Sequence, residues 1–139
     1  MPITSVFIDD VVEQLEMVDS MSHHFFNTAT GEFGWYNEEY PSDEDDPEQF
    51  EEDEWIALPS SWDIHEYDIM ARFTAGVRDA RKQDSLEHAL HGKGAFRRFK
   101  DTLIRTGLEQ QWYDYRDQAL LRIAKEWCEE NDIAYTTKP

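Results

Sequence analysis

The sequence has one cysteine and no long apolar segment, and both features limit the kinds of protein it can be. Cys128 has no second cysteine with which to form an internal disulfide, which fits a reducing compartment. No apolar run approaches the roughly 18 residues needed to span a bilayer, and the first residues lack the cations of a secretory signal. We therefore expect a soluble, cytoplasmic protein.

Lysine and arginine are missing from the first half of the chain. All 13 of them lie at or after Arg72, so residues 1–71 contain 20 Asp and Glu and no Lys or Arg. Residues 72–139 contain 11 acids and 13 bases, and the whole chain has a net charge of −18. A local cationic patch on such an acidic protein can still bind an anion, although the overall field slows the approach of a polyanion. Alternatively, the acidic part covers the basic part.

Aromatic residues are plentiful, with five Trp, six Tyr and eight Phe in 139 residues. They provide enough bulky apolar surface for a core that needs no disulfide or metal. No internal repeat and no Gly/Ser linker marks a boundary, so we expect a single domain over residues 1–139.

The first half of the chain combines one helical pattern with strand patterns. Apolar residues at helical spacing predict a helix over about 6–18. Two aromatic runs within residues 23–36 flank a short connection that contains Gly31, which predicts a hairpin, and the apolar run 55–58 predicts a third antiparallel strand. The intervening residues 37–54 contain 11 acids, no bases and two prolines, so we expect an acidic, mobile loop there.

Helical patterns dominate the second half of the chain. Four helices are predicted, at about 63–78, 84–92, 95–106 and 108–130. Asp63 and Asp84, each followed three residues later by Glu, indicate the starts of the first two. Residues 133–136 either form an edge strand or continue without regular secondary structure. Together the patterns predict an α+β fold with four to five helices packed on a small antiparallel sheet.

The run Gly92-Lys93-Gly94-Ala95-Phe96-Arg97-Arg98-Phe99-Lys100-Asp101 is the most distinctive segment. Together with Thr30-Gly31-Glu32, Leu58-Pro59, Ile69-Met70-Ala71-Arg72-Phe73, Trp112 and Trp127, it resembles Uncharacterised Protein Family 0158 over nearly the whole chain. That family consists of soluble bacterial proteins without an assigned activity. The resemblance therefore implies one domain and provides no reaction, cofactor or catalytic residue to carry over. The long acidic segment departs from the family pattern.

The same segment is the main candidate for a binding site. Two glycines before a helix let backbone N–H groups approach an anion, and the helix dipole and nearby cations add positive charge. The predicted anion-binding residues are Gly92, Lys93, Gly94, Arg97, Arg98 and Lys100. In the alternative interpretation the glycines only allow a tight turn between helices. The segment is not a phosphate loop, because neither G-x-x-x-x-G-K-[ST] nor G-x-G-x-x-G is present.

The helix that follows this turn carries both apolar and charged residues. Phe96, Phe99 and Leu103 share one helical face, which we expect to be core. On another face Arg97, Asp101 and Arg105 are spaced to form an ordinary row of surface ion pairs.

Other candidate sites are weaker. His88 and His91 share a helical face, but no third metal ligand can be identified, and Cys128 has no neighbouring cation to activate it. The acids at 43–48 lack the EF-hand pattern, and no G-x-S-x-G motif is present. We predict no cofactor, metal or catalytic residue.

These observations lead to a hypothesis of a non-catalytic binding or regulatory module. Its basic segment Gly92–Arg105 would contact an anionic ligand or an acidic protein, with no membrane partner and no strong indication of a nucleic acid. One alternative is a small enzyme that depends on a metal or a histidine. Another is an acidic mimic of nucleic acid that uses the N-terminal half of the chain.

Overall fold

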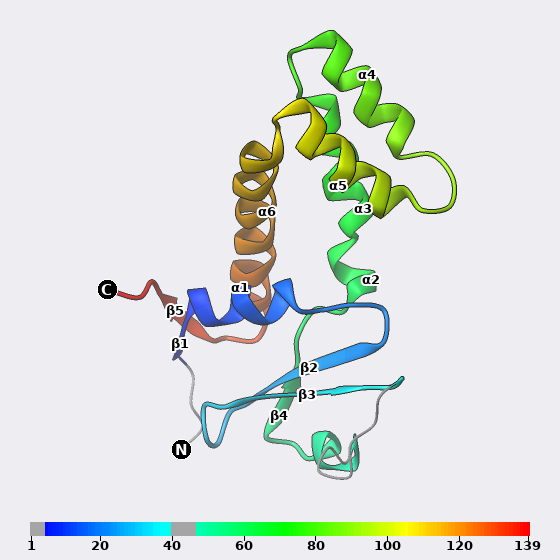
Figure 1. Ribbon diagram of the computed structural model, residues 1–139. Coiled ribbons are helices and arrows are strands. Elements are labelled where there is room, and N and C mark those ends of the chain that lie inside the picture. Colours follow the sequence, from blue (N-terminus) through cyan, green and yellow to red (C-terminus); the bar gives the residue numbers. More distant parts are fainter. Residues whose placement is uncertain (1–4, 40–46) are drawn as a thin grey trace. The chain divides into compact units, whose positions relative to one another are not determined.

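The computed structural model describes residues 5–39 and 47–139, which form an α+β fold (Figure 1). The chain divides into two compact units. The sheet unit comprises the residues up to Ile64 and those from Leu120 onward, and the helical unit comprises His65–Ala119. Within the described residues, five helices of nine or more residues accompany a three-stranded antiparallel sheet, which confirms the predicted fold class. The expectation of a single domain over 1–139 stays a prediction.

The three-stranded sheet is built as the aromatic runs predicted. Strand β2 (Ser22–Asn27) lies between β3 (Phe33–Asn37) and β4 (Trp55–Ala57) and is antiparallel to both. Phe26 is the Cα partner of Phe33 on one side and of Ile56 on the other. The hairpin turn needs Gly31, whose φ of 79° lies in the left-handed region.

A second sheet in the same unit was not predicted. Strand β1 (Ser5–Phe7) pairs in parallel with β5 (Ala134–Thr136). Just beyond β5, the backbone N–H of Lys138 donates to Asp9 at 2.7 Å and its ammonium lies 2.6 Å from Asp10. Residues near the two ends of the chain are thereby held together, and one of the two alternatives for 133–136, the strand, is confirmed.

Two helical segments form the core of the sheet unit. Helix α1 (Ile8–Glu16) buries three aliphatic side chains, Ile8, Val11 and Leu15. The part of α6 (Glu109–Glu130) that belongs to this unit is attached to the sheet through Trp127, whose indole N–H donates to the carbonyl of Ala57 at 2.8 Å. Cys128 is fully buried beside it, and this burial raises the pKa of its thiol to about 11. The thiol thus packs in the core.

The predicted acidic loop is only partly a loop. Its residues 40–46 lie outside the described part of the chain, but Pro47–Glu51 form a 3-10 helix, η1. The ring of Phe50 stacks on Phe25 with centroids 4.3 Å apart, over a position where the partner strand has Gly34. The expectation of a mobile loop over all of 37–54 is therefore wrong for η1, because one aromatic side chain in the acidic run packs on the sheet.

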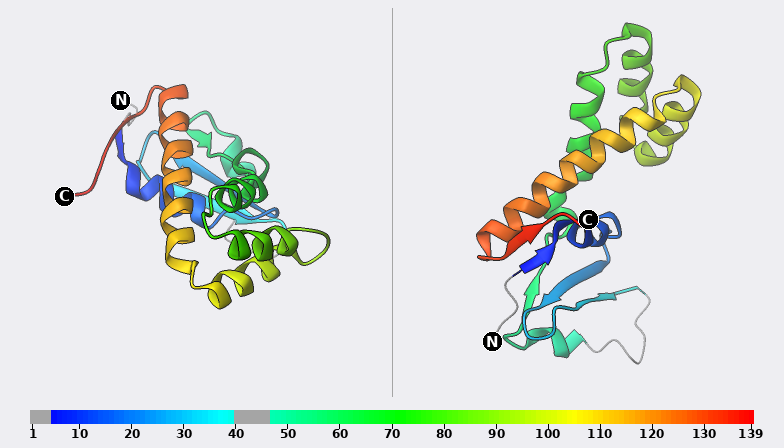
Figure 2. Two further views of the ribbon diagram at one scale, coloured as in Figure 1. Left: turned by 90° about the horizontal axis from the view of Figure 1, so that it is seen from above. Right: turned by 90° about the vertical axis from the view of Figure 1, so that its left-hand side faces the viewer.

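The helical unit contains α3 (Glu66–Ala75), α4 (Ala80–Ala89), α5 (Ala95–Thr106) and the first part of α6. Helices α4 and α5 lie side by side (Figure 2). The core is an aromatic cluster in which the Phe99 ring centroid lies 6.4 Å from that of Phe73 and 5.0 Å from that of Trp112, both edge to face. The predicted role of Phe99 as a core residue is confirmed, and Trp112 is buried with it.

Two predicted helix starts are wrong. The segment expected as one helix over 63–78 is divided into α2 (Ser61–Ile64) and α3 by His65, whose φ is 53°. Asp63 does not begin a helix: its carboxylate accepts from the backbone N–H of Ser60, which completes a capping box one turn earlier. Likewise α4 begins at Ala80 and not at Asp84, because the Asp79 carboxylate caps it.

A buried histidine connects α1 to the sheet. His24 lies with one ring nitrogen, Nδ1, 3.0 Å from the side-chain oxygen of Gln14 and with Nε2 3.1 Å from the hydroxyl of Ser22. Since the amide oxygen only accepts, Nδ1 carries the proton and donates, and neutral His24 can accept from Ser22 through Nε2. Burial lowers the pKa of His24, against the opposing effect of Asp19.

This burial predicts a pH-dependent stability. Because the pKa is lower in the folded chain, the unfolded chain binds this proton more readily as the pH falls below about 6.5, so the free energy of unfolding falls as the pH decreases. One such group contributes a slope of at most about 1.4 kcal/mol per pH unit. Urea unfolding between pH 7 and 5.5 should show a shallower dependence in the His24→Gln protein.

His88→Gln is the matched control for this measurement. His88 is exposed, and a hydrogen bond to the Asp84 carbonyl, followed by the charge of Asp84, raises its pKa, so it stabilises the fold at low pH. Removing it should make the loss of stability on acidification steeper. Equal slopes in wild type and His24→Gln would contradict the assigned role of His24.

Candidate functional site

The turn between α4 and α5 needs both of its glycines for backbone reasons. Gly92 has a φ of 76° and Gly94 a φ of 78°, a region that other residues enter only with strain. At Gly94 an added Cβ would also lie 3.2 Å from a guanidinium nitrogen of Arg98. The tight turn between helices is therefore present, and anion binding at this segment stays a prediction.

Arg98 is directed into this turn. Its Nη1 donates to the carbonyl oxygen of Lys93, and its Nη2 donates to the carbonyl oxygens of His91 and, at 3.4 Å, Gly92. Three consecutive carbonyls thus face one guanidinium, which holds the turn closed. Of the six predicted anion-binding residues, Arg98 is the one whose side-chain N–H groups already donate to backbone carbonyl oxygens of the described chain.

The remaining predicted cations lie on an open surface. Lys93, Arg97 and Lys100 are exposed, as is Arg105. Within the described part of the chain, none of these four forms an ion pair, so the row expected from Arg97 through Asp101 to Arg105 is not present.

The apolar residues of α5 divide between core and solvent. Phe99 and Leu103 are each 1% exposed, but Phe96 is 53% exposed, so the prediction that it belongs to the core is wrong. Phe96 lies in the first turn of the helix, one helical step from Lys100, and Ile104 follows on the same side with 64% exposure. The exposed surface formed by Lys93, Phe96, Arg97, Lys100, Ile104 and Arg105 is called the α5 face below.

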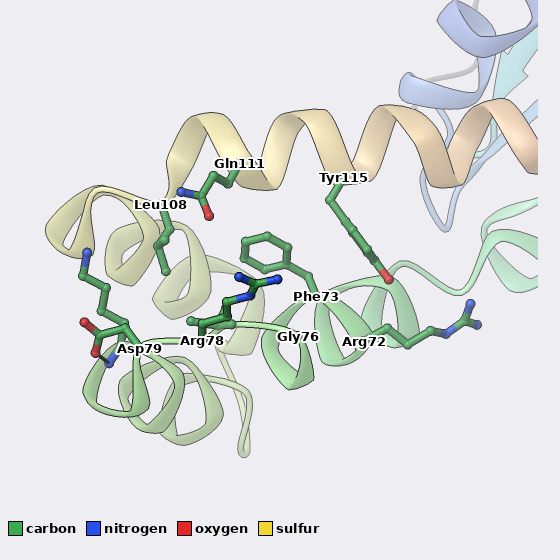
Figure 3. Close-up of a pocket in the computed structure, with 10 residues that line it drawn as sticks. Arg72, Phe73, Gly76, Arg78, Asp79, Leu108, Gln111 and Tyr115 are labelled. Carbon is green, nitrogen blue, oxygen red and sulfur yellow. Dashed lines mark hydrogen bonds between the residues drawn. The ribbon is translucent and has the colours of Figure 1, made fainter.

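A second group of cations surrounds a pocket that sequence reasoning missed. The pocket has a volume of about 550 Å³ and is lined by residues from α3, the α3–α4 connection, α4 and the start of α6. In the view of Figure 3 the Arg78 guanidinium is drawn next to the Phe73 ring in the middle of this region, and Arg72 extends away from the other labelled residues. The residues that define this cationic pocket are Arg72, Phe73, Gly76, Arg78, Lys82 and Tyr115.

One signal in the sequence pointed to this region. Four of the 13 bases fall within residues 72–82, a density similar to that of the basic helix. They occupy the end of one helix, a connection and the start of another, so they share no helical face and produce no periodic pattern. Only the tertiary packing against residues 108–115 turns three of them into the rim of a pocket.

The histidine candidates occupy a shallower groove between α4 and α5. This groove of about 340 Å³ brings His88 together with Asp101 and Arg105. His88 itself is held by the Asp84 carbonyl, 2.8 Å from its Nδ1. Among residues 5–39 and 47–139 no cluster of three or more His, Cys, Asp or Glu side chains is placed to hold a metal ion. The expected absence of a metal or cofactor stays a prediction.

In the described residues no helix combines the length and the apolar composition that crossing a bilayer requires.

Comparisons with known proteins give a family without a described activity. The model of a family described as Uncharacterised protein family (UPF0158) matches residues 4–138. UPF0158 protein PA5073 from Pseudomonas aeruginosa is 33% identical over 66 residues, which are 47% of this chain and 43% of that protein. The match therefore spans less than half of the relative's length. No solved structure matches the chain. Because the family match covers nearly all of the sequence, as the resemblance implied, this chain belongs to the uncharacterised family UPF0158.

Proposed function

We propose that this protein is a non-catalytic binding module that docks an acidic protein segment on the α5 face. One observation carries the proposal: exposed cations without ion pairs among the described residues alternate with exposed apolar side chains on a single helix.

The chemistry of the α5 face is mixed. Phe96, Lys100 and Ile104 follow one another at intervals of four residues and form a ridge, and Arg97 and Arg105 lie beside it. Apolar surface gains free energy when a partner covers it, and arginine and lysine select a partner with carboxylates. A helix or strand that carries both Asp or Glu and apolar side chains matches this surface.

A protein segment fits better than a nucleic acid for two reasons. Ile104 is aliphatic, so it gains nothing from base stacking, which usually accompanies phosphate contacts in binding of single strands. The chain also has a net charge of −18, which repels a long polyanion before it reaches a local patch. A short acidic segment meets less repulsion, and its apolar contacts offset what remains.

The distribution of charge favours the helical unit as the binding part. By sequence it contains nine Asp and Glu and ten Lys and Arg, whereas the sheet unit contains 22 acids and three bases. Ten cations in 55 residues leave several exposed side chains available for a partner.

The test is binding of a fluorescent peptide that carries glutamate and leucine at helical spacing. We expect saturable binding that weakens with added salt and that falls about tenfold or more in the triple variant Arg97→Glu, Lys100→Glu, Ile104→Ser. Arg122→Glu, an exposed charge reversal in the sheet unit, is the control and should change the affinity by less than about twofold.

Three results would reject the proposal. The first is that the peptide fails to bind. The second is that the control variant weakens peptide binding as much as the triple variant does. The third is that a single-stranded RNA of equal length binds more tightly than the peptide. Arg98→Lys provides a further check, because Arg98 holds the turn: it should lower the melting temperature without a matching loss of peptide affinity.

A further inference from the structure

The cationic pocket has the volume and the aromatic lining of a small-molecule site. Its volume of about 550 Å³ lies within the range of roughly 300–1,000 Å³ that is typical of ligand pockets. Phe73 contributes a ring that is fixed from two sides, with centroids 5.4 Å from Trp112 and 5.5 Å from Tyr115. The half-buried Tyr115 adds a second aromatic surface (Figure 3).

Among the described residues, three cations and one acid line this pocket. Arg72 comes from α3, Arg78 from the connection and Lys82 from α4, and none of them forms an ion pair with a described residue. The carboxylate among the lining residues belongs to Asp79, and it accepts the backbone N–H groups of Arg81 at 3.0 Å and Lys82 at 3.1 Å. Its role is to cap α4, and the pocket keeps an excess of positive charge.

The nearby helix ends do not cancel this excess. At the C-terminal end of α3, the Gln83 side-chain amide donates to the carbonyls of Thr74 at 3.2 Å and Ala75 at 3.1 Å. These carbonyls, the negative end of the helix dipole, are therefore occupied by a neutral donor. Helix α4 also begins at the pocket, but the Asp79 carboxylate occupies its first N–H groups, so the excess positive charge comes from the three side chains.

From this arrangement we infer that the cationic pocket binds a small organic phosphate that carries a flat ring. Arginine guanidinium groups match the oxygens of a phosphate with paired hydrogen bonds, and lysine adds a point charge. Phe73 and Tyr115 provide the surface against which a flat ring packs. The three cations would bind any small anion, whereas Phe73 and Tyr115 favour an anion that also carries a flat ring.

This site is separate from the α5 face, because the two sets of residues have no member in common. A partner protein on α5 and a small ligand in the pocket can therefore be tested independently. Failure of one leaves the other unaffected.

Gly76 offers a way to fill the pocket without straining the chain. Its φ is −90° and its ψ is −2°, which does not require glycine, and the nearest atom to an added Cβ is the Phe73 carbonyl oxygen at 3.6 Å, an ordinary contact. Since Gly76 lines the pocket, leucine at this position occupies ligand space. Gly76→Leu therefore tests the pocket by shape, whereas Arg78→Gln tests it by charge.

The experiment is calorimetric titration of the full chain with adenosine diphosphate and with 1-naphthyl phosphate. Inorganic pyrophosphate and adenosine are the matched probes for charge alone and ring alone. We expect at least one ring phosphate to bind about tenfold more tightly than both matched probes, and Gly76→Leu and Arg78→Gln each to weaken it by about tenfold or more. Arg105→Gln removes an exposed arginine outside the pocket and should leave the affinity within about twofold.

Other outcomes overturn the inference. It is overturned if neither ring phosphate binds, if pyrophosphate binds as tightly as both ring phosphates do, or if the Gly76→Leu protein keeps its affinity for the ring phosphate. Loss of binding in Arg105→Gln equal to that in Arg78→Gln would place the ligand on α5 and also reject the pocket. Circular dichroism of each variant establishes that it is folded, and Gly76→Leu remains informative if Arg78→Gln is not.

Discussion

Replacing Phe99 with alanine is expected to lower the free energy of unfolding by about 3–5 kcal/mol, which is the usual cost of removing a buried phenylalanine. Phe99 is 1% exposed and packs edge to face against both Phe73 and Trp112. Its removal leaves a cavity at the centre of the helical unit, lined by rings that cannot easily move closer. Urea unfolding followed by far-UV circular dichroism measures the change.

Phe96→Ala is the matched control on the same helix. Phe96 is 53% exposed, so the same substitution three residues earlier should change the free energy of unfolding by no more than about 0.5 kcal/mol. Similar losses for the two variants would mean that Phe96 also contributes to the core, and would contradict the assignment of Phe96 to the α5 face.

Gly34→Ala is expected to destabilise the sheet unit by about 1–3 kcal/mol through overpacking. A Cβ at this position would lie 2.7 Å from one ring carbon of Phe50 and 3.1 Å from another, and 3.1 Å from the ring of Trp55. Phe50 already stacks on Phe25, so it must lose that contact to make room. Because Phe50 belongs to η1, the substitution should loosen the acidic segment as well.

The double variant identifies the cause. If contact with Phe50 produces the effect, Gly34→Ala should cost clearly less in a protein that already carries Phe50→Ala, since only Trp55 then remains close. Equal costs in the two backgrounds would show that glycine is required here for another reason. The cycle also tests whether η1 is docked on the sheet in solution, and limited proteolysis within residues 47–54 provides an independent measure.

The two candidate surfaces differ in how much of them could be predicted. Helix α5 was predicted with its observed boundaries because Gly94 and Gly107, both with positive φ, mark its ends. Its exposed cations follow directly from helical spacing. The orientation of Phe96 does not, because it lies at the border of the apolar stripe, where neighbouring elements decide whether a side chain is covered.

The cationic pocket could not be predicted in the same way. Its lining residues come from two stretches, 72–82 and 108–115, that are more than 20 residues apart in the sequence. Charge density in the first stretch was visible, but a pocket requires that the second stretch pack opposite to it. No local pattern contains that information.

Local physical chemistry, contained in the sequence alone, determined most of the helices, the hairpin and the separation of acidic from basic residues, because spacing, glycine conformation and charge act over a few neighbours. Tertiary structure decided the parallel pairing of Ser5–Phe7 with Ala134–Thr136 and the packing of residues 108–115 opposite 72–82. The reason is the same in both cases: the partner is distant in sequence, so no local spacing contains it.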